Sequence, residues 1–379
     1  MSKNVYSSQN YLTTNVFEEA LNRVRFVFDN CDDVIVSMSG GKDSTVIFNL
    51  AMIVAKERGR LPLKVFWLDQ EAEWDATGRY MNYIMRRKDV QPYWFQIPFD
   101  FTNSLSFENN FLKVWDEEKK DIWIRPQSDI SIKVNPTKLN RFHDLVENLP
   151  SYCDVEDKKH VGVLVGMRIN ESCNRRMTIC YTKSQYKGIT WCRKNIKNTR
   201  VFYPIYDFND TDIWTAIARN KWKYNTIYDL FYRYGISGSD MRVSALIHET
   251  AWHSIERLQE CEPNIYNRYL DRINGVNCFS QFGKDIMVKD LPAVFKDWKE
   301  YRDYLLKAFV KPEYWEIFQK RWVGQDDETW YKCHIREVMV NDIDGTINVN
   351  KRTERKVRKR TKNNYYVEKE AKKRERAVK

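Results

Sequence analysis

The chain has 379 residues, a formal net charge of +11, and 42% hydrophobic and 14% aromatic side chains. It is long enough for one large core or two domains, and too rich in apolar residues for a chain that is disordered throughout. It contains no run of ~18 apolar residues and no hydrophobic signal segment near its start, so we expect a cytoplasmic protein without a membrane span.

Segments with strand and helix patterns alternate along the first 235 residues. Residues 14–29 place apolar side chains at i+3 and i+4 spacings, which predicts an amphipathic helix. Strands are expected at Val34–Met38, Leu63–Leu68, Val90–Ile97, His160–Gly166 and Val201–Ile205, with helices at about Ser44–Arg58 and through Met85. This alternation predicts an α/β fold, a Rossmann-like parallel sheet with helices on both faces.

Two regions depart from that alternation. Residues 100–155 have no clean period, and we interpret them as an insertion with some helix that forms a lid over the site. Residues 236–350 are mostly helical in pattern, as in Ser244–Gln259 and Trp298–Phe309. The expected organisation is therefore an α/β domain at 1–235, a helical domain at 236–350 and a tail at 351–379.

The positive charge is concentrated in that tail. Residues 351–379 contain 14 Lys or Arg and four Glu, a net of +10, which leaves +1 for the other 350 residues. Such a run is typical of a solvated segment, and also of an arm that binds nucleic acid electrostatically. Nucleic acid is therefore an expected partner of residues 351–379, and both interpretations stay open.

The eight cysteines form no C-x-x-C pair, which excludes a zinc ribbon of that type. Cys173, Cys180 and Cys192 are close enough in sequence for an iron–sulfur site. Scattered reduced thiols are the favoured interpretation for a cytosolic chain.

The most informative segment joins the first expected strand to the next helix. Glycines at 40 and 41 let the backbone approach an anion, and the helix start offers unpaired N–H groups and a positive dipole end. Hydroxyl groups and one ammonium group add further donors. The order of residues differs from a Walker A loop because an aspartate follows the lysine. The segment reads Ser37-Met38-Ser39-Gly40-Gly41-Lys42-Asp43-Ser44-Thr45 and predicts a phosphate-binding loop.

This loop resembles the S-G-G-x-D-S pyrophosphate loop (PP-loop) of the adenine nucleotide alpha-hydrolase superfamily, which includes ATP pyrophosphatases and phosphoadenylylsulfate (PAPS) reductases. Residues 166–176 resemble the G-x-R-x-x-[EQ]-S-x-x-R segment of PAPS reductases. Residues 203–214 and 223–229 resemble that family's D-[VI]-W and Y-N-x-[LI]-Y-D segments. Asp69–Thr77 lies where the family has D-T-G-x-x-F-P-E-T, although only its first and last residues match.

Arg168 and either Arg175 or Arg176 follow a buried strand, where their guanidinium groups could clamp phosphate or sulfate oxygens. The alternative interpretation is a pair of surface arginines at a helix start. Asp210 or Thr211 is expected to cap the helix that follows, and Trp214 and Tyr228 are interpreted as core residues.

The resemblance implies a bound nucleotide, ATP or PAPS, together with Mg²⁺. Lys42, Asp43 and Arg168 are the expected catalytic residues, and Asp43 is also the candidate metal ligand. Asp69 or Glu71 is expected near the ribose or the metal. The full set expected to contact the nucleotide is Ser39, Gly40, Gly41, Lys42, Ser44, Thr45, Asp69, Arg168 and Arg175.

A later stretch, His248–Trp252 and the residues after it, resembles a subgroup of PAPS-reductase-like proteins of unknown activity. Members of that subgroup often occur beside a ParB-like protein in phages and mobile elements. The resemblance therefore implies a ParB-like partner.

The departures from the family narrow the chemistry. Reduction of a sulfonucleotide needs a nucleophilic thiol, yet residues 235–240 lack the cysteine of assimilatory enzymes, and the last cysteine is Cys333, beside His334. The favoured function is ATP pyrophosphatase or adenylyl-transfer chemistry at the α-phosphate, in nucleic-acid modification or in phage or mobile-element defence. A PAPS-reductase-type enzyme and a non-catalytic nucleotide-sensing regulator stay open.

Overall fold

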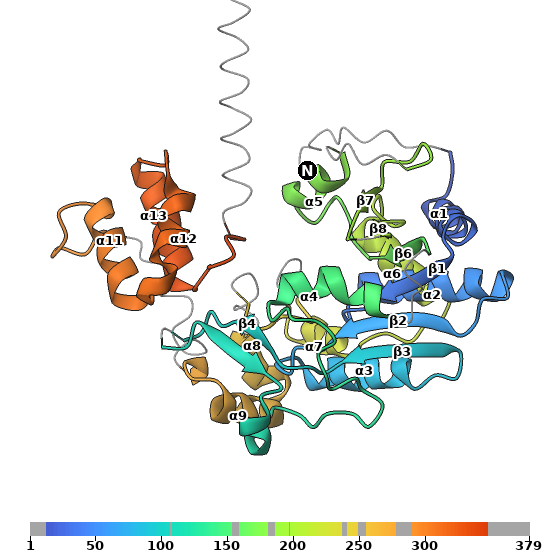
Figure 1. Cartoon of the computed structure of the whole chain (residues 1–379), viewed down its shortest axis with the longest axis horizontal. Coiled ribbons are helices and arrows are strands. Elements are labelled where there is room, and N and C mark those ends of the chain that lie inside the picture. Colours follow the sequence, from blue (N-terminus) through green and yellow to red (C-terminus); the bar gives the residue numbers. More distant parts are fainter. Residues whose placement is uncertain are drawn as a thin grey trace, which may run out of the picture. The chain divides into compact units, whose positions relative to one another are not determined.

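The computed structural model describes residues 13–106, 108–153, 159–180, 186–196, 198–236, 241–248, 255–277 and 290–347. By its internal contacts the chain divides into two compact units (Figure 1). Unit 1 takes the residues up to Asp69, Asp75–Ile97 and Gln127–Arg233, and unit 2 takes Gln70–Trp74, Pro98–Pro126 and the residues from Tyr234 on. The tail at 351–379 lies outside the described residues.

Unit 1 is built on a six-stranded sheet in the order β3-β2-β1-β6-β8-β7. Its strands are parallel except for β7, which runs antiparallel to β8. The central strand is β1, whose Val36 pairs with Val65 of β2 and with Leu164 of β6. The strands are β1 (Asp33–Ser37), β2 (Leu63–Leu68), β3 (Val90–Phe95), β6 (Val161–Leu164), β7 (Cys192–Lys194) and β8 (Thr199–Phe202).

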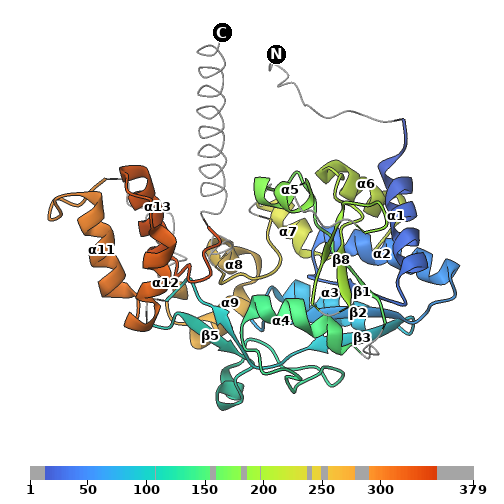
Figure 2. The same ribbon diagram turned by 45° about the horizontal axis from the view of Figure 1, so that its top comes forward.

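Both faces of this sheet are covered. Consecutive residues Val34, Ile35 and Val36 are buried in β1, and all four residues of β6 are buried. Successive side chains of a strand point to opposite faces, so such runs need cover on both sides. The expected α/β fold, a parallel sheet with helices on both faces, is confirmed, and the antiparallel edge strand β7 is an addition to it (Figure 2).

The helices of unit 1 connect these strands. Helices α1, α2 and α6 pack against one another, and α3 packs against β3. In α1 the buried residues Ala20, Val24 and Val27 repeat at helical spacing, and the Asn15 side chain caps the helix by accepting from the N–H of Phe17. The helices are α1 (Val16–Asn30), α2 (Lys42–Glu57), α3 (Asp75–Met85), α4 (Phe142–Asn148), α5 (Cys173–Cys180), α6 (Asp210–Arg219) and α7 (Ile227–Arg233), with the 3₁₀ turn η2 (Leu149–Tyr152).

The segment interpreted as an insertion contains strands that the sequence did not predict. An antiparallel pair, β4 (Phe99–Thr102) and β5 (Phe111–Val114), precedes the 3₁₀ turn η1 (Glu117–Ile122). The buried aromatics Phe99 and Phe101 alternate with a less buried residue, but four residues are too few to reveal a period. By its contacts Pro98–Pro126 belongs to unit 2, whereas the residues from Gln127 to Cys153 belong to unit 1.

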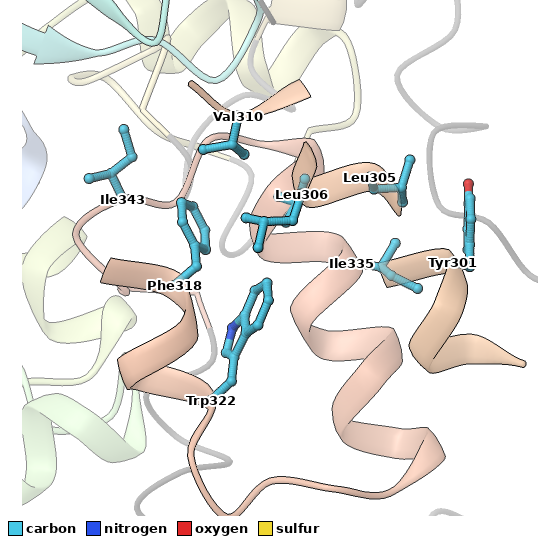
Figure 3. Close-up of a cluster of buried hydrophobic side chains, with 9 residues drawn as sticks. Tyr301, Leu305, Leu306, Val310, Phe318, Trp322, Ile335 and Ile343 are labelled. Atoms are coloured by element: carbon cyan, nitrogen blue, oxygen red, sulfur yellow. The ribbon is translucent and has the colours of Figure 1, made fainter. Parts of the chain in front are cut away.

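The helical part of unit 2 has its own hydrophobic core, formed by α11, α12 and α13 (Figure 3). Its helices are α8 (Ile255–Cys261), α9 (Pro263–Arg272), α11 (Trp298–Phe309), α12 (Pro312–Trp322) and α13 (Glu328–Met339). The buried cluster consists of Tyr301, Leu305, Leu306, Val310, Phe318, Trp322, Ile335, Val338 and Ile343. The helix predicted at Trp298–Phe309 has those bounds in the structure.

The helix predicted at Ser244–Gln259 is wrong in its first part. Residues 241–248 are not helical, and Ala245 has a φ of +60°, a left-handed conformation that interrupts a right-handed helix. Residues 249–254 lie outside the described part of the chain, and α8 begins at Ile255. None of the helices in the described ranges is long and apolar enough to span a lipid bilayer.

Candidate functional site

The loop between β1 and α2 forms a tight turn at the carboxyl end of the central strand. Gly40 has a φ of +72°, and a Cβ atom built on it would lie 2.7 Å from Cγ2 of Thr77. Both the backbone conformation and the close approach therefore require glycine at this position. Gly41 follows in an extended conformation and is the N-cap residue of α2, without a side-chain cap.

The start of α2 presents backbone N–H groups that have no acceptor among the described residues. Within the described residues, the amides of Gly40, Gly41, Asp43 and Ser44 donate no hydrogen bond. The Lys42 N–H is the exception among its neighbours, because it donates to the hydroxyl oxygen of Tyr228 at 3.0 Å. The first turn of a 16-residue helix thus offers free donors and the positive end of its dipole, which suits a phosphate group.

A residue from the segment before α7 fixes the loop from outside. Asn225 is fully buried, and its side-chain amide donates to the carbonyl of Gly40 at 3.1 Å and to the hydroxyl of Thr77 at 2.8 Å. The side-chain carbonyl oxygen of Asn225 accepts from the N–H of Ile227 at 3.1 Å. The segment that resembles the Y-N-x-[LI]-Y-D motif therefore supplies the side chain that holds the tight turn at Gly40.

The hydroxyl groups of the loop bind mainly to the loop itself. Ser44 and Thr45 each donate to the carbonyl of Gly41 at 2.9 Å, and Ser39 Oγ lies 3.4 Å from Ser44 Oγ. Thr45 is fully buried, with its Oγ1 2.9 Å from the hydroxyl of Tyr80. Burial raises the pKa of Tyr80 to about 12, so this phenol stays neutral at pH 7. These contacts hold Gly41 in place at the start of α2.

The three expected catalytic residues lie together. The Nζ atom of Lys42 lies 3.9 Å from Oδ2 of Asp43 and 3.3 Å from Oδ1 of Asp210. Arg168 donates from Nε to Oδ1 of Asp43, and from its second terminal nitrogen to Asp210 at 3.1 Å and to Glu171 at 3.2 Å. Lys42 and Arg168 are 8% and 4% exposed, so water screens these charges weakly.

The remaining predicted arginine is farther along the same segment. Arg175 forms an ion pair with Glu171, the carboxylate that also accepts from Arg168. Its side chain is 39% exposed. Arg175 therefore shares the Glu171 carboxylate with Arg168.

A second glycine, Gly166, brings the segment after β6 close to the start of α2. A Cβ atom on Gly166 would lie 2.7 Å from the carbonyl carbon of Asp43 and 2.9 Å from the backbone nitrogen of Ser44. Backbone atoms cannot rotate away as a side chain can. Only glycine lets the chain pass here and carry Arg168 to Asp43 two residues later.

Asp69 and Glu71 both have partners. Oδ2 of Asp69 accepts from Nε1 of Trp94 and from Nε2 of Gln96, each at 2.9 Å, within unit 1. Glu71 belongs to unit 2, where its carboxylate accepts from Arg272 at 2.8 and 3.1 Å. The expectation that Asp69 or Glu71 lies near the ribose or the metal stays a prediction.

The residues around Asp43 do not fit a protein-made metal site. Among the residues that the structure describes, no group of three or more His, Cys, Asp or Glu is arranged to hold a metal ion. The Asp43 carboxylate already accepts from Arg168 and lies beside Lys42. Its assignment as a metal ligand stays a prediction.

The sequence did not identify three residues of this site. The sequence pattern favours Asp210 or Thr211 as the helix cap, but Asn209 is the N-cap of α6 and forms a capping box with Asp212. This leaves the Asp210 carboxylate for Lys42 and Arg168. Asn225 lay in a motif without an assigned role, and Tyr228 was interpreted as core. All three residues follow the last strand of the sheet, β8. Segments after parallel strands meet at one edge of the sheet, so this position in the chain was the signal that could have identified them.

Comparison with known proteins finds matches for both parts of the chain. Residues 33–234 match the model of the phosphoadenosine phosphosulfate reductase domain. Residues 235–373 match a domain of unknown function (DUF3440). The chain is 25% identical over 327 residues to the uncharacterized protein YbdN of Escherichia coli (strain K12), covering 78% of this chain and 76% of that protein.

Solved structures are similar at a lower level. An FMN adenylyltransferase of Candida glabrata, in complex with FMN and the ATP analog AMPCPP, has a TM-score of 0.35 and 10% identity. The match covers 58% of this chain and 64% of that one, which is less than two thirds of its length. A PAPS reductase of Candida auris, in a phosphate complex, has a TM-score of 0.33 and 10% identity over 59% of this chain and 94% of that one.

Both TM-scores are below 0.5, and neither likeness bears on the activity of this chain. The family match covers more than half of the sequence and includes the loop, Arg168 and Tyr228. The chain therefore belongs to the phosphoadenosine phosphosulfate reductase domain family.

Proposed function

We propose that this chain binds an adenine nucleotide by its phosphates at the start of α2 and acts on ATP at the α-phosphate. The observation that carries the proposal is the set of unused amides on Gly40, Gly41, Asp43 and Ser44, beside the ammonium group of Lys42. An anion at this point would receive backbone donors and the helix dipole together. Membership in a family named for a nucleotide substrate supports the choice of ligand.

The proposed reaction is transfer of the adenylyl group. An oxygen of the acceptor attacks the α-phosphorus, the bond from that phosphorus to the bridging oxygen breaks, and pyrophosphate leaves with the electron pair. Negative charge therefore accumulates on the leaving group, where fixed positive groups lower the barrier. Lys42, the first turn of α2 and Arg168 are the groups of this chain assigned to that task.

Asp43 has a positioning role in this scheme. Its carboxylate holds the Arg168 guanidinium, and α2 in turn holds Asp43 in its first turn. Mg²⁺ enters the proposal only as the counterion of the ATP substrate, because the described residues around Asp43 do not form a metal site.

Sulfonucleotide reduction is less well supported. Its nucleophile would have to be a thiol, and Cys333 is only 5% exposed within α13. The neighbouring His334 stacks on Trp322 at 4.6 Å and hydrogen-bonds to Gln325 at 2.8 Å, so its ring is held in the core of unit 2. Residues 237–240 lie outside the described part of the chain.

Nucleic acid is the proposed acceptor or effector. The support is compositional: 14 Lys or Arg against four Glu in residues 351–379 give an arm that phosphate backbones attract without sequence preference. A role beside a ParB-like partner in phage or mobile-element defence remains part of this proposal.

The test is release of pyrophosphate from Mg-ATP, with and without added DNA or RNA. Wild type is compared with a Lys42→Ala, Asp43→Ala double variant and with Lys56→Ala, which changes an exposed lysine at the other end of α2. The proposal predicts release by wild type and by the Lys56 variant, and none by the double variant. Nucleotide binding without pyrophosphate release would contradict turnover and would favour a non-catalytic nucleotide-sensing regulator.

A further inference from the structure

The hydroxyl group of Tyr228 lies at the first turn of α2, although the ring of the same residue belongs to the core. Tyr228 is 5% exposed, and its ring makes edge contacts with Trp214 at 5.2 Å and with Phe231 at 5.9 Å. Its oxygen accepts from the Lys42 N–H at 3.0 Å, and Nζ of Lys42 lies 5.6 Å from the ring centroid. The ring contacts fix where the oxygen lies.

This oxygen uses only half of its hydrogen-bonding capacity. A phenol accepts and also donates one proton. Among the described residues, no acceptor receives the Tyr228 proton, since the contact with Lys42 is the only hydrogen bond of this side chain. A buried hydroxyl normally finds an acceptor. The missing acceptor is therefore expected from a ligand.

The phenol also keeps its proton at neutral pH. Burial raises the pKa of Tyr228 most strongly, and the nearby carboxylates of Asp43 and Asp210 raise it further, while the Lys42 N–H and Arg168 lower it. A neutral phenol is a donor, whereas a phenolate would repel an anion. The charge state is thus the one that anion binding needs.

We propose that the Tyr228 hydroxyl donates a hydrogen bond to a non-bridging oxygen of the phosphate held at the start of α2. Without Tyr228, the Lys42 N–H would point at the anion itself. It donates to the phenol oxygen instead, and the phenol O–H is then the group that donates to the anion. Hydrogen bonds in such a chain polarise one another, which strengthens the terminal donor. This inference rests on the proposed function and adds a binding residue to the same site.

The test compares Tyr228→Phe with Tyr203→Phe by calorimetric titration with inorganic pyrophosphate. Tyr203 is another buried tyrosine of unit 1, but its hydroxyl has a partner in Arg193. Tyr228→Phe is expected to weaken pyrophosphate binding by about 10-fold or more, the usual effect of losing a hydrogen bond to a charged group. Tyr203→Phe is expected to bind pyrophosphate like wild type.

The outcomes separate this inference from the proposed function. If wild type binds pyrophosphate and Tyr228→Phe binds it equally well, the inference is overturned and the phosphate site stands. If wild type binds neither pyrophosphate nor ATP, both are overturned.

A second measurement covers the case in which Tyr228→Phe does not fold. 3-Fluorotyrosine placed at position 228 of the full chain keeps the ring and the hydroxyl. Its ¹⁹F resonance is expected to shift on addition of pyrophosphate and to stay unchanged with adenosine, which has no phosphate. An unchanged resonance at saturating pyrophosphate would overturn the inference.

Discussion

Oδ1 of Asp210 lies 3.3 Å from Nζ of Lys42, so the lysine of the loop binds a carboxylate of the chain itself. The same oxygen accepts from Arg168 at 3.1 Å. A phosphate that binds Lys42 and Arg168 must compete with this carboxylate. The Asp210 side chain is 57% exposed and lies at the first position of α6, so it has room to turn away.

Asp210→Asn is therefore expected to tighten pyrophosphate binding by about fivefold, equivalent to ~1 kcal/mol for a partly exposed charge pair. The control is Asp207→Asn, which removes a carboxylate that pairs with Arg23 at 2.7 Å and has no contact with Lys42 among the ion pairs of the described residues. Calorimetric titration measures both variants. Unchanged or weaker binding by Asp210→Asn would show that Asp210 does not compete with the anion.

Gly166→Ala is expected to disturb the start of α2. The added Cβ would meet the backbone of Asp43 at 2.7 Å, and a displacement of this kind costs about 1–3 kcal/mol. Gly59→Ala is the control, because Gly59 has a φ of +61° but nothing within 4 Å of the added atom. Urea unfolding should show both variants destabilised, whereas ATP binding should fall only for Gly166→Ala. Equal ATP affinity in the two variants would refute the role of this close approach.

Asn225→Ala is expected to lower the free energy of unfolding by about 2–3 kcal/mol, because the carbonyl of Gly40 and the N–H of Ile227 lose a buried partner. The turn that depends on Gly40 loosens, so ATP affinity should fall as well. Urea unfolding and ATP titration of the same preparation check the two effects. A stability loss with full ATP affinity would mean that Asn225 supports the fold without shaping the loop.

Cys31 is expected to be an unreactive thiol. Burial raises its pKa to about 11 from 9.0, so its thiolate fraction at pH 8 is roughly 100-fold below that of an unperturbed thiol. The pKa of Cys31 is higher in the folded protein than in the unfolded chain, so its protonated thiol contributes fully to the free energy of unfolding below pH 9. This contribution is lost as the pH rises through about 11. Peptide mapping after iodoacetamide treatment at pH 8 measures the reactivity of the Cys31 thiol. Rapid alkylation of Cys31 in the folded protein would contradict it.

Deletion of residues 351–379 is expected to weaken nucleic-acid binding and to flatten its dependence on salt, because 14 cationic side chains are removed. Fluorescence anisotropy with a labelled oligonucleotide at several salt concentrations measures the slope. The deletion should leave ATP affinity unchanged, since the loop lies in unit 1. An unaltered slope would refute a role for the tail.

The sequence predicted the sheet of unit 1 well because its strands are continuous apolar runs. Leu63–Leu68 has the same bounds in the prediction and in the structure. Strands β7, β4 and β5 were not predicted, because each mixes polar with apolar residues and lacks the continuous buried run of β6.

The tight turn at Gly40 and the start of α2 could also be predicted from the sequence, because local rules govern both. Gly40 needs a left-handed φ, and helix starts bind anions. Contacts between segments that are far apart in the chain could not be predicted from the sequence. Asp210 and Tyr228 are 168 and 186 residues from Lys42, and nothing local reveals that one supplies a carboxylate and the other a hydroxyl.

The central claim is that phosphate binds at the start of α2, and the most direct measurement is calorimetric titration of ATP into wild type and the Lys42→Ala, Asp43→Ala double variant. The account predicts saturable binding by wild type and none by the double variant, with both proteins folded. Equal ATP affinity in the two proteins would contradict it.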